Sequence, residues 1–180
     1  MAKVSSQGGI ERLAASIAEL PKKRAAVGFF DTAVYPDGTP VAYVATIQEF
    51  GHGKIPPRSF MRSTISEQRE AWQKTLAQGA RRVLADKLTV DQMLEAFGQS
   101  VAGQVKEKIA SIMAPALSPI TLELRALKKQ GVKISAKTVR IAAQDYALDG
   151  LSSAAAAVSN KPLVDTGYLI SSVDSKVEAR

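Results

Sequence analysis

The sequence predicts a helix-rich α+β protein in which a small β-sheet is covered by long amphipathic helices. Apolar residues recur at helical spacing over two long segments, residues 63–86 and 91–114. Short apolar runs suited to strands occur at residues 25–30 and 172–178. The 180-residue chain is 46% hydrophobic, which is normal for a folded protein, and its length suits one domain with or without an appendage.

Composition excludes several kinds of site. The chain has no cysteine, so it has no disulfide, thiolate zinc site or cysteine nucleophile. Its single histidine, His52, lies between two glycines, so a histidine-rich metal site is also excluded. We expect neither a metal nor a cofactor. No segment approaches the roughly 20 apolar residues of a membrane span, and residues 1–9 lack the apolar core of a secretory signal. We therefore expect a cytosolic protein without a membrane contact.

The first third of the chain predicts a helix, a strand and a second helix. Residues 10–20 place Ile10, Leu13, Ile17 and their neighbours on one face, and the following proline ends that helix. Residues 25–30 read as a buried strand. Residues 41–50 fit either a buried strand or a short helix, and we favour the helix because Gly51 is a natural C-terminal stop. Two glycines and two prolines exclude regular structure from residues 51–57.

The remaining helices are marked by their ends. Thr89 predicts an N-cap for the helix over residues 91–114, and Pro115 closes it. Ser118 followed by Pro119 opens a third helix that stops at Gly131. A short helix or turn at residues 168–172 precedes the last strand.

A basic, alanine-rich segment over residues 132–160 differs from the rest of the chain. Residues 135–159 have a helical pattern, but much of their apolar content is alanine, which buries little area per residue. We therefore expect this segment to be mobile, or ordered only against a partner.

Most of the net charge of +7 is local. Residues 121–140 contain six basic side chains against Glu123 alone, a local charge of +5. The default interpretation is a solvated helix face; the alternative is contact with nucleic-acid phosphates, as in a basic cytosolic DNA-binding protein. No aromatic residue follows until Tyr146, so stacking on single-stranded bases is unsupported. The basic residues are Arg125, Lys128, Lys129, Lys133, Lys137 and Arg140.

The sharpest local motif is Asp165-Thr166-Gly167, which follows two apolar residues. It is similar to the catalytic loop of retroviral-type aspartic proteases, in which two carboxylates share a proton. That fold needs most of its sheet after the Asp, whereas 13 residues follow Gly167 here. A protease is therefore the least favoured function, and the simpler interpretation is that Asp165 caps the short helix that follows.

Three segments taken together are more specific than any one of them. In this order they resemble the virion morphogenesis family of tailed bacteriophages, which includes tail completion and neck proteins. The resemblance covers about residues 25–131 and 161–177, and the basic segment 132–160 interrupts it. The segments are Gln48-Glu49-Phe50-Gly51 with Lys54-Ile55-Pro56-Pro57-Arg58-Ser59-Phe60-Met61-Arg62; Pro115-Ala116-Leu117-Ser118-Pro119-Ile120-Thr121 with Arg125 and Gly131; and Pro162-Leu163-Val164-Asp165-Thr166-Gly167-Tyr168-Leu169 with Ser171-Ser172.

The resemblance implies a structural protein with no active site. Such proteins form rings at the head–tail junction or at the head-proximal end of the tail, after assembly in the bacterial cytoplasm. The implied partners are further copies of the chain, other head–tail connector or tail-tube proteins, and genomic DNA in the lumen. The six basic residues would contact that DNA or an acidic partner subunit. Residues 1–131 and 161–180 would form one α+β domain, with residues 132–160 as a helical insert.

We also expect specific residues at subunit contacts. The loop over residues 51–57 would present Arg and aromatic side chains, which are favoured at interfaces. The expected interface residues are Glu49, Phe50, Pro57, Arg58, Phe60, Asp165, Thr166 and Gly167.

Overall fold

A computed structural model describes residues 6–180, with side chains from residue 9 onward. It shows a helix-rich α+β chain with one small sheet, as the sequence predicts. Residues 1–5, part of the segment read as lacking a secretory signal, lie outside the described residues. The elements are α1 (Ser6–Glu19), the 3₁₀ helix η1 (Leu20–Lys22), β1 (Lys23–Phe29), α2 (Val41–Phe50), α3 (Met61–Leu84), α4 (Val90–Ser111), α5 (Pro119–Lys129), α6 (Ala136–Asp149), α7 (Ser153–Ala156), α8 (Tyr168–Ser171) and β2 (Val173–Ala179).

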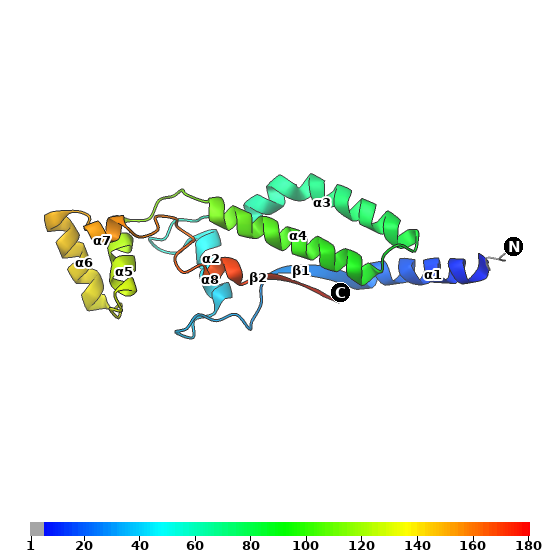
Figure 1. The fold of residues 1–180 in the computed structure, drawn as a ribbon, viewed down its shortest axis with the longest axis horizontal. Helices are drawn as coiled ribbons and strands as arrows, with labels where there is room; N and C mark the ends of the chain where they lie inside the picture. The colour runs from blue at the N-terminus through cyan, green and yellow to red at the C-terminus, as the bar shows by residue number, and fades with distance from the viewer. Residues whose placement is uncertain (1–5) are drawn as a thin grey trace.

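The sheet joins segments from the two ends of the described chain. Strands β1 and β2 pair antiparallel, with Lys23 opposite Ala179 and Phe29 opposite Val173. Helix α4 packs on this sheet, and α3 packs on α4 (Figure 1). Gly98 allows the close approach, because a Cβ at that position would lie 3.0 Å from the Ser175 Cβ. The predicted layer of long helices over a small sheet is therefore confirmed.

Local end signals explain where the helices begin. The Thr89 hydroxyl accepts a hydrogen bond from the Gln92 N–H while the Gln92 side chain accepts one from the Thr89 N–H, forming a capping box for α4. The Ser118 hydroxyl caps α5 by accepting a hydrogen bond from the Thr121 N–H, with Pro119 at the first helical position. Both predicted starts are confirmed. Gly51 ends α2 with φ of 79°, and a side chain there would collide with the Ile55 carbonyl.

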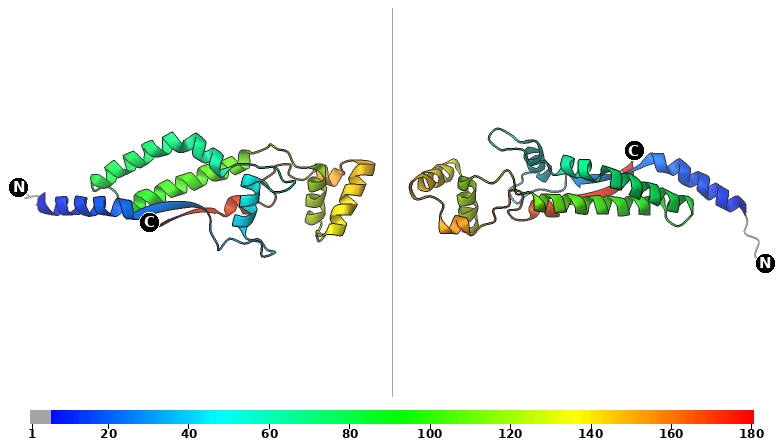
Figure 2. Two further views of the ribbon diagram at one scale, coloured as in Figure 1. Left: turned by 180° about the vertical axis from the view of Figure 1, so that it is seen from behind. Right: turned by 90° about the horizontal axis from the view of Figure 1, so that it is seen from above.

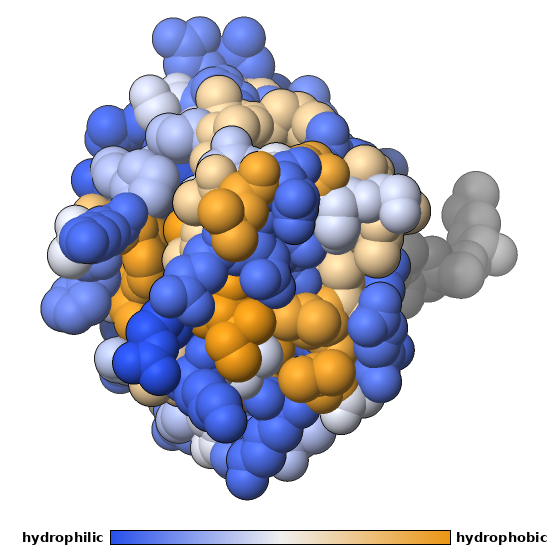
Figure 3. Space-filling view, turned by 90° about the vertical axis from the view of Figure 1, so that its left-hand side faces the viewer, coloured by the Kyte–Doolittle hydropathy of each residue, from blue (hydrophilic) through white to orange (hydrophobic). Residues whose placement is uncertain are grey.

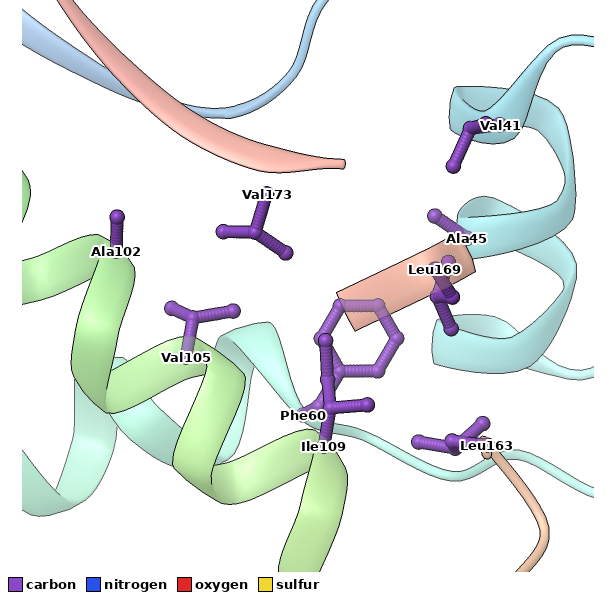
Figure 4. Close-up of a cluster of buried hydrophobic side chains, with 9 residues drawn as sticks. All are labelled: Val41, Ala45, Phe60, Ala102, Val105, Ile109, Leu163, Leu169 and Val173. Carbon is purple, nitrogen blue, oxygen red and sulfur yellow. The ribbon is translucent and has the colours of Figure 1, made fainter. Parts of the chain in front are cut away.

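The main core lies where α2, α4, α8 and the sheet meet. Phe60 is 1% exposed, and its ring meets that of Phe29 edge-on at 6.0 Å between centroids. Figure 4 shows nine buried side chains of this cluster converging from these elements and from the start of α3. Helix α2 contributes Val41 and Ala45, which settles the ambiguity at residues 41–50 in favour of the helix.

The chain is elongated, and α5, α6 and α7 lie together at one end of it (Figures 1 and 2). We call residues 119–156, which contain these three helices, the lobe. We call α1–α4, α8 and the two strands the body. Helix α1 projects at the opposite end of the body from the lobe. The predicted domain boundary at residue 131 falls between α5 and α6, which pack on each other.

The alanine-rich segment orders against its own chain. Helices α6 and α7 both pack on α5, and Ala142 and Ala155 are buried there. The Glu123 carboxylate on α5 accepts hydrogen bonds from the Ser152 N–H at 2.6 Å and the Ser152 hydroxyl at 2.7 Å, which fixes the start of α7. The expectation of order only against a separate partner is therefore wrong, because α5 supplies the covering surface.

Candidate functional site

The residues of the three family-like segments meet where the chain passes between body and lobe. We call this region, residues 48–60, 112–118 and 157–167, the junction. Arg58 connects two of the segments that form the junction. Its guanidinium donates hydrogen bonds to the Pro115 carbonyl at 2.9 Å, the Ala116 carbonyl at 3.2 Å and the Gln48 side chain at 3.2 Å. Arg58 is 5% exposed, so it holds the crossing from α4 to α5 against the end of α2.

Glu49 caps the longest helix of the body. Its carboxylate accepts hydrogen bonds from the N–H groups of Phe60, Met61 and Arg62 at 2.8–3.1 Å, which are orphan donors at the start of α3. The Ser59 hydroxyl and the Arg62 guanidinium also donate to it, at 2.7 and 2.9 Å. A negative charge at a helix N-terminus is favourable. Glu49 is 5% exposed, so its role is to fix α2 against α3.

Arg125 performs the equivalent task for the returning chain. Its guanidinium donates to the carbonyl groups of Ser159, Lys161 and Val164 from one nitrogen and to that of Pro162 from the other, at 2.7–3.4 Å. Its Nε lies 3.5 Å from the Asp165 carboxylate. The planar fork of five donors suits a ring of carbonyl groups. Arg125 therefore anchors residues 159–165 to α5.

Two cations and one anion are buried at or beside the junction: Arg58 and Glu49 within it, and Arg125 on the adjoining α5. Burial, and secondarily the charge of Arg125, lower the pKa of Arg58. Burial also lowers the pKa of Arg125, an effect that Asp165 opposes. Burial alone would raise the pKa of Glu49, but the hydrogen bonds from Met61, Ser59 and Arg62 prevail and lower it to about 2. Each charge is thus stabilised by hydrogen bonds that the fold supplies.

A hollow of about 200 Å³ opens beside the junction. The rings of Tyr35 and Tyr168, 5.0 Å apart, line it together with the side chains of Lys128 and Asp165. Burial and the Asp165 charge raise the pKa of Tyr35. The charged groups paired with Asp165 within the chain are the cations Arg125 and Lys128.

Asp165 does not cap the following helix. Helix α8 begins at Tyr168, its N-cap is Gly167 with φ of 77°, and no side chain closes a cap there. Instead the Thr166 hydroxyl accepts from the Tyr168 N–H at 3.4 Å. The predicted capping role of Asp165 is therefore wrong, because its carboxylate is turned toward Arg125 and Lys128.

The expected interface residues divide into two groups. Glu49, Arg58 and Phe60 are buried within the chain, so their prediction as exposed subunit contacts is wrong. Their side chains are used by the start of α3, the crossing to α5 and the core. The other residues reach the surface, where Phe50 lies under the Arg62 guanidinium at 4.5 Å. Those that remain at least partly exposed are Phe50, Pro57, Asp165, Thr166 and Gly167.

The six basic residues between residues 121 and 140 also fall into two groups, one buried and one exposed. Arg125 is 9% exposed and fully engaged by carbonyl groups, so its prediction as a contact for DNA or an acidic partner is wrong. The other five cations are exposed on α5, α6 and the loop between them. Lys128 pairs with Asp165 at 3.8 Å. Among the described side chains, no carboxylate forms an ion pair with the remaining four, Lys129, Lys133, Lys137 and Arg140.

Several side chains that form hydrogen bonds or line the hollow at the junction could not be predicted from the sequence. Gln48, Ser59 and Arg62 occur in the family-like segments, but the sequence does not show that they share one carboxylate or one guanidinium. Tyr35 lies in a turn-rich stretch with no helical or strand pattern. Their roles depend on contacts between segments that are distant in the chain.

Within residues 6–180, no helix is both long and apolar enough to cross a membrane. No group of three or more candidate metal-binding side chains is found among the described residues. Comparison of the chain with family models, with curated proteins and with solved structures finds no match. The buried charged groups at the junction bind backbone, and polar and aromatic side chains line the hollow beside it.

Proposed function

We propose that this chain is a non-enzymatic structural protein of a tailed-bacteriophage or prophage virion. It acts as a tail completion or neck protein that forms a ring at the head–tail interface, with other connector or tail-tube proteins as partners. The observation that carries the proposal is the elongated shape with apolar helical surface exposed at both ends. Ile10 on α1 is 67% exposed and Leu148 on α6 is 81% exposed. Large apolar side chains clustered on a surface mark interaction sites.

The junction supports the same proposal. The family-like segments come together in space, and their buried charged side chains hydrogen-bond to backbone groups of neighbouring segments. Arg58 and Arg125 each bind several backbone carbonyl groups, and Glu49 binds three backbone N–H groups. A chain built this way holds body and lobe in a fixed relation, which a repeating assembly requires. Different surfaces at its two ends favour head-to-tail association, which gives a ring where the rotation between successive copies closes.

The proposal is tested in solution and in the virion. We expect mass photometry and negative-stain images of the purified chain to show a closed oligomer. We also expect deletion of its gene from the parent phage or prophage to leave heads and tails that do not join. A chain that stays monomeric at high concentration, together with joined particles in the deletion, would contradict the proposal.

A second candidate function is binding of DNA by the lobe. Residues 119–156 contain six Lys and Arg against three Asp and Glu, a net charge of +3. Exposed cations are the main requirement for contact with phosphates. The same surface would face DNA in a ring lumen, so this candidate is compatible with the first.

Reversing the exposed charges of the lobe tests whether these cations bind DNA or only contact solvent. We expect Lys129→Glu combined with Lys133→Glu and Lys137→Glu to weaken double-stranded DNA binding at least tenfold and to reduce the salt dependence of the binding constant. Fluorescence anisotropy over a salt series measures both quantities. The matched control reverses three exposed cations of the body, Lys54, Arg69 and Lys74. Equal losses in the two triple variants would show that only the net charge matters.

A further inference from the structure

Helix α1 exposes almost all of its surface. Every residue from 9 to 15 is exposed, and α1 packs beside the C-terminal end of α3. Isolated helices of this length are marginal in water. Ile10, Leu13 and Ile17 recur at spacings of three and four residues, so they form one stripe. We call these three residues the α1 stripe.

Helix α6 has a similar stripe at the other end of the molecule. Ala142 is buried against the rest of the lobe, whereas Ile141 and Leu148, two turns apart on one side of α6, are 41% and 81% exposed. Ile134, just before the helix, and Leu151, just after it, are exposed as well. Figure 3 shows apolar residues gathered over this end of the molecule among hydrophilic ones. We call Ile134, Ile141, Leu148 and Leu151 the α6 stripe.

We propose that the α1 stripe of one copy packs on the α6 stripe of the next copy. Both stripes contain two large aliphatic residues spaced seven apart, Ile10 and Ile17 on one and Ile141 and Leu148 on the other. Seven residues are about two helical turns, so the two pairs match in length along their helix axes. One kind of contact, repeated from copy to copy, then covers both exposed surfaces.

Charge selects this pairing over the symmetric one. Two α6 stripes in contact would bring together two lobes that each have a net charge of +3 over residues 119–156. Helix α6 itself is neutral, so this charge lies on α5 and on the loop between α5 and α6. Helix α1 has Glu11 and Glu19 against Arg12, a net charge of −1. Glu19 and Arg12 already pair within the chain, with Lys23 and Asp86, so Glu11 remains beside the α1 stripe to face the cations of a lobe. Opposite potentials favour the α1–α6 contact and disfavour the α6–α6 contact.

This inference rests on the proposed homo-oligomer and is tested with two variants of opposite ends. Ile17→Lys removes the α1 stripe, and Leu148→Lys removes the α6 stripe. We expect each variant alone to be monomeric by mass photometry and light scattering. An equimolar mixture is expected to form a dimer with one copy of each, since each variant retains the stripe that the other lacks. The expected mass is twice the 19.2 kDa of one chain.

The control is Ile65→Lys, which places the same charge at an exposed apolar position of α3 and is expected to leave the oligomer intact. Circular dichroism checks the fold of every variant, and Ile10→Lys replaces Ile17→Lys if the latter unfolds. An oligomeric wild type whose two stripe variants still assemble, or whose variants do not pair when mixed, overturns the α1–α6 contact while leaving the ring proposal standing. A monomeric wild type overturns the α1–α6 contact, and joined particles in the deletion would then overturn the ring proposal as well.

Discussion

Replacing Glu49 by glutamine is expected to lower the free energy of unfolding by about 3 kcal/mol, because hydrogen bonds to a charged buried group are worth roughly twice those between neutral groups. The substitution keeps the shape of the side chain. It removes the charge that binds three N–H groups at the start of α3 and the guanidinium of Arg62. It also replaces one accepting oxygen by an amide NH₂ group, which is a donor and would face another donor. Urea unfolding measures the difference, with Glu70→Gln, an exposed glutamate of α3, as the control.

The same residue predicts a dependence of stability on pH. The pKa of Glu49 is about 2 in the folded chain, against an ordinary value of 4.5. A depressed pKa means that the stabilisation is present above the unfolded value and is lost as the pH falls from 4.5 toward 2. We expect the wild type to lose stability more steeply over this interval than Glu49→Gln. Parallel curves for the two proteins would contradict the capping role.

Replacing Arg125 by methionine is expected to destabilise the junction by about 3–5 kcal/mol, the range found when one member of a buried charged contact is removed. Methionine fills a similar volume but leaves the carbonyl groups of residues 159–164 without their donors and Asp165 without its nearer cation. Arg125→Lys is expected to retain little of the stability, because a single ammonium group cannot reach all four carbonyl groups.

Hydrogen exchange locates the effect of that substitution. We expect faster exchange in residues 157–167 and in the lobe, with α3 and α4 unchanged, because local units open independently of the most stable region. Lys129→Met, an exposed neighbour on α5, serves as the control. Unchanged exchange in residues 157–167 of Arg125→Met would contradict the anchoring role.

Local signals predicted the elements well because the physics of helix ends is itself local. Thr89 and Ser118 bond to N–H groups three residues away, so the partners are visible in the sequence. Glu49 performs the same task for α3 from 11 to 13 residues away, across an irregular loop. No spacing rule relates a capping carboxylate to a helix on the far side of such a loop, so Glu49 was expected at the surface.

The errors at Phe60 and Arg125 have related causes. A loop with two glycines and two prolines is typical of the surface, and this predicted exposure for the aromatic residue that follows it. The loop instead turns back so that Phe60 enters the core beside Phe29. Six cations in twenty residues predicted one basic surface, but α5 has two sides, and Arg125 lies on the side that the returning chain covers.

The pairing of β1 with β2 also sets an order of events during synthesis. Residues 23–29 leave the ribosome early, yet their partner strand, residues 173–179, follows roughly 150 residues later. Contacts so distant in sequence close late, whereas the lobe joins helices that are neighbours along the chain. The lobe can therefore fold while the body still lacks its second strand. A nascent chain would complete its body only once that strand has been made, so an unfinished chain would display an ordered lobe beside an incomplete sheet.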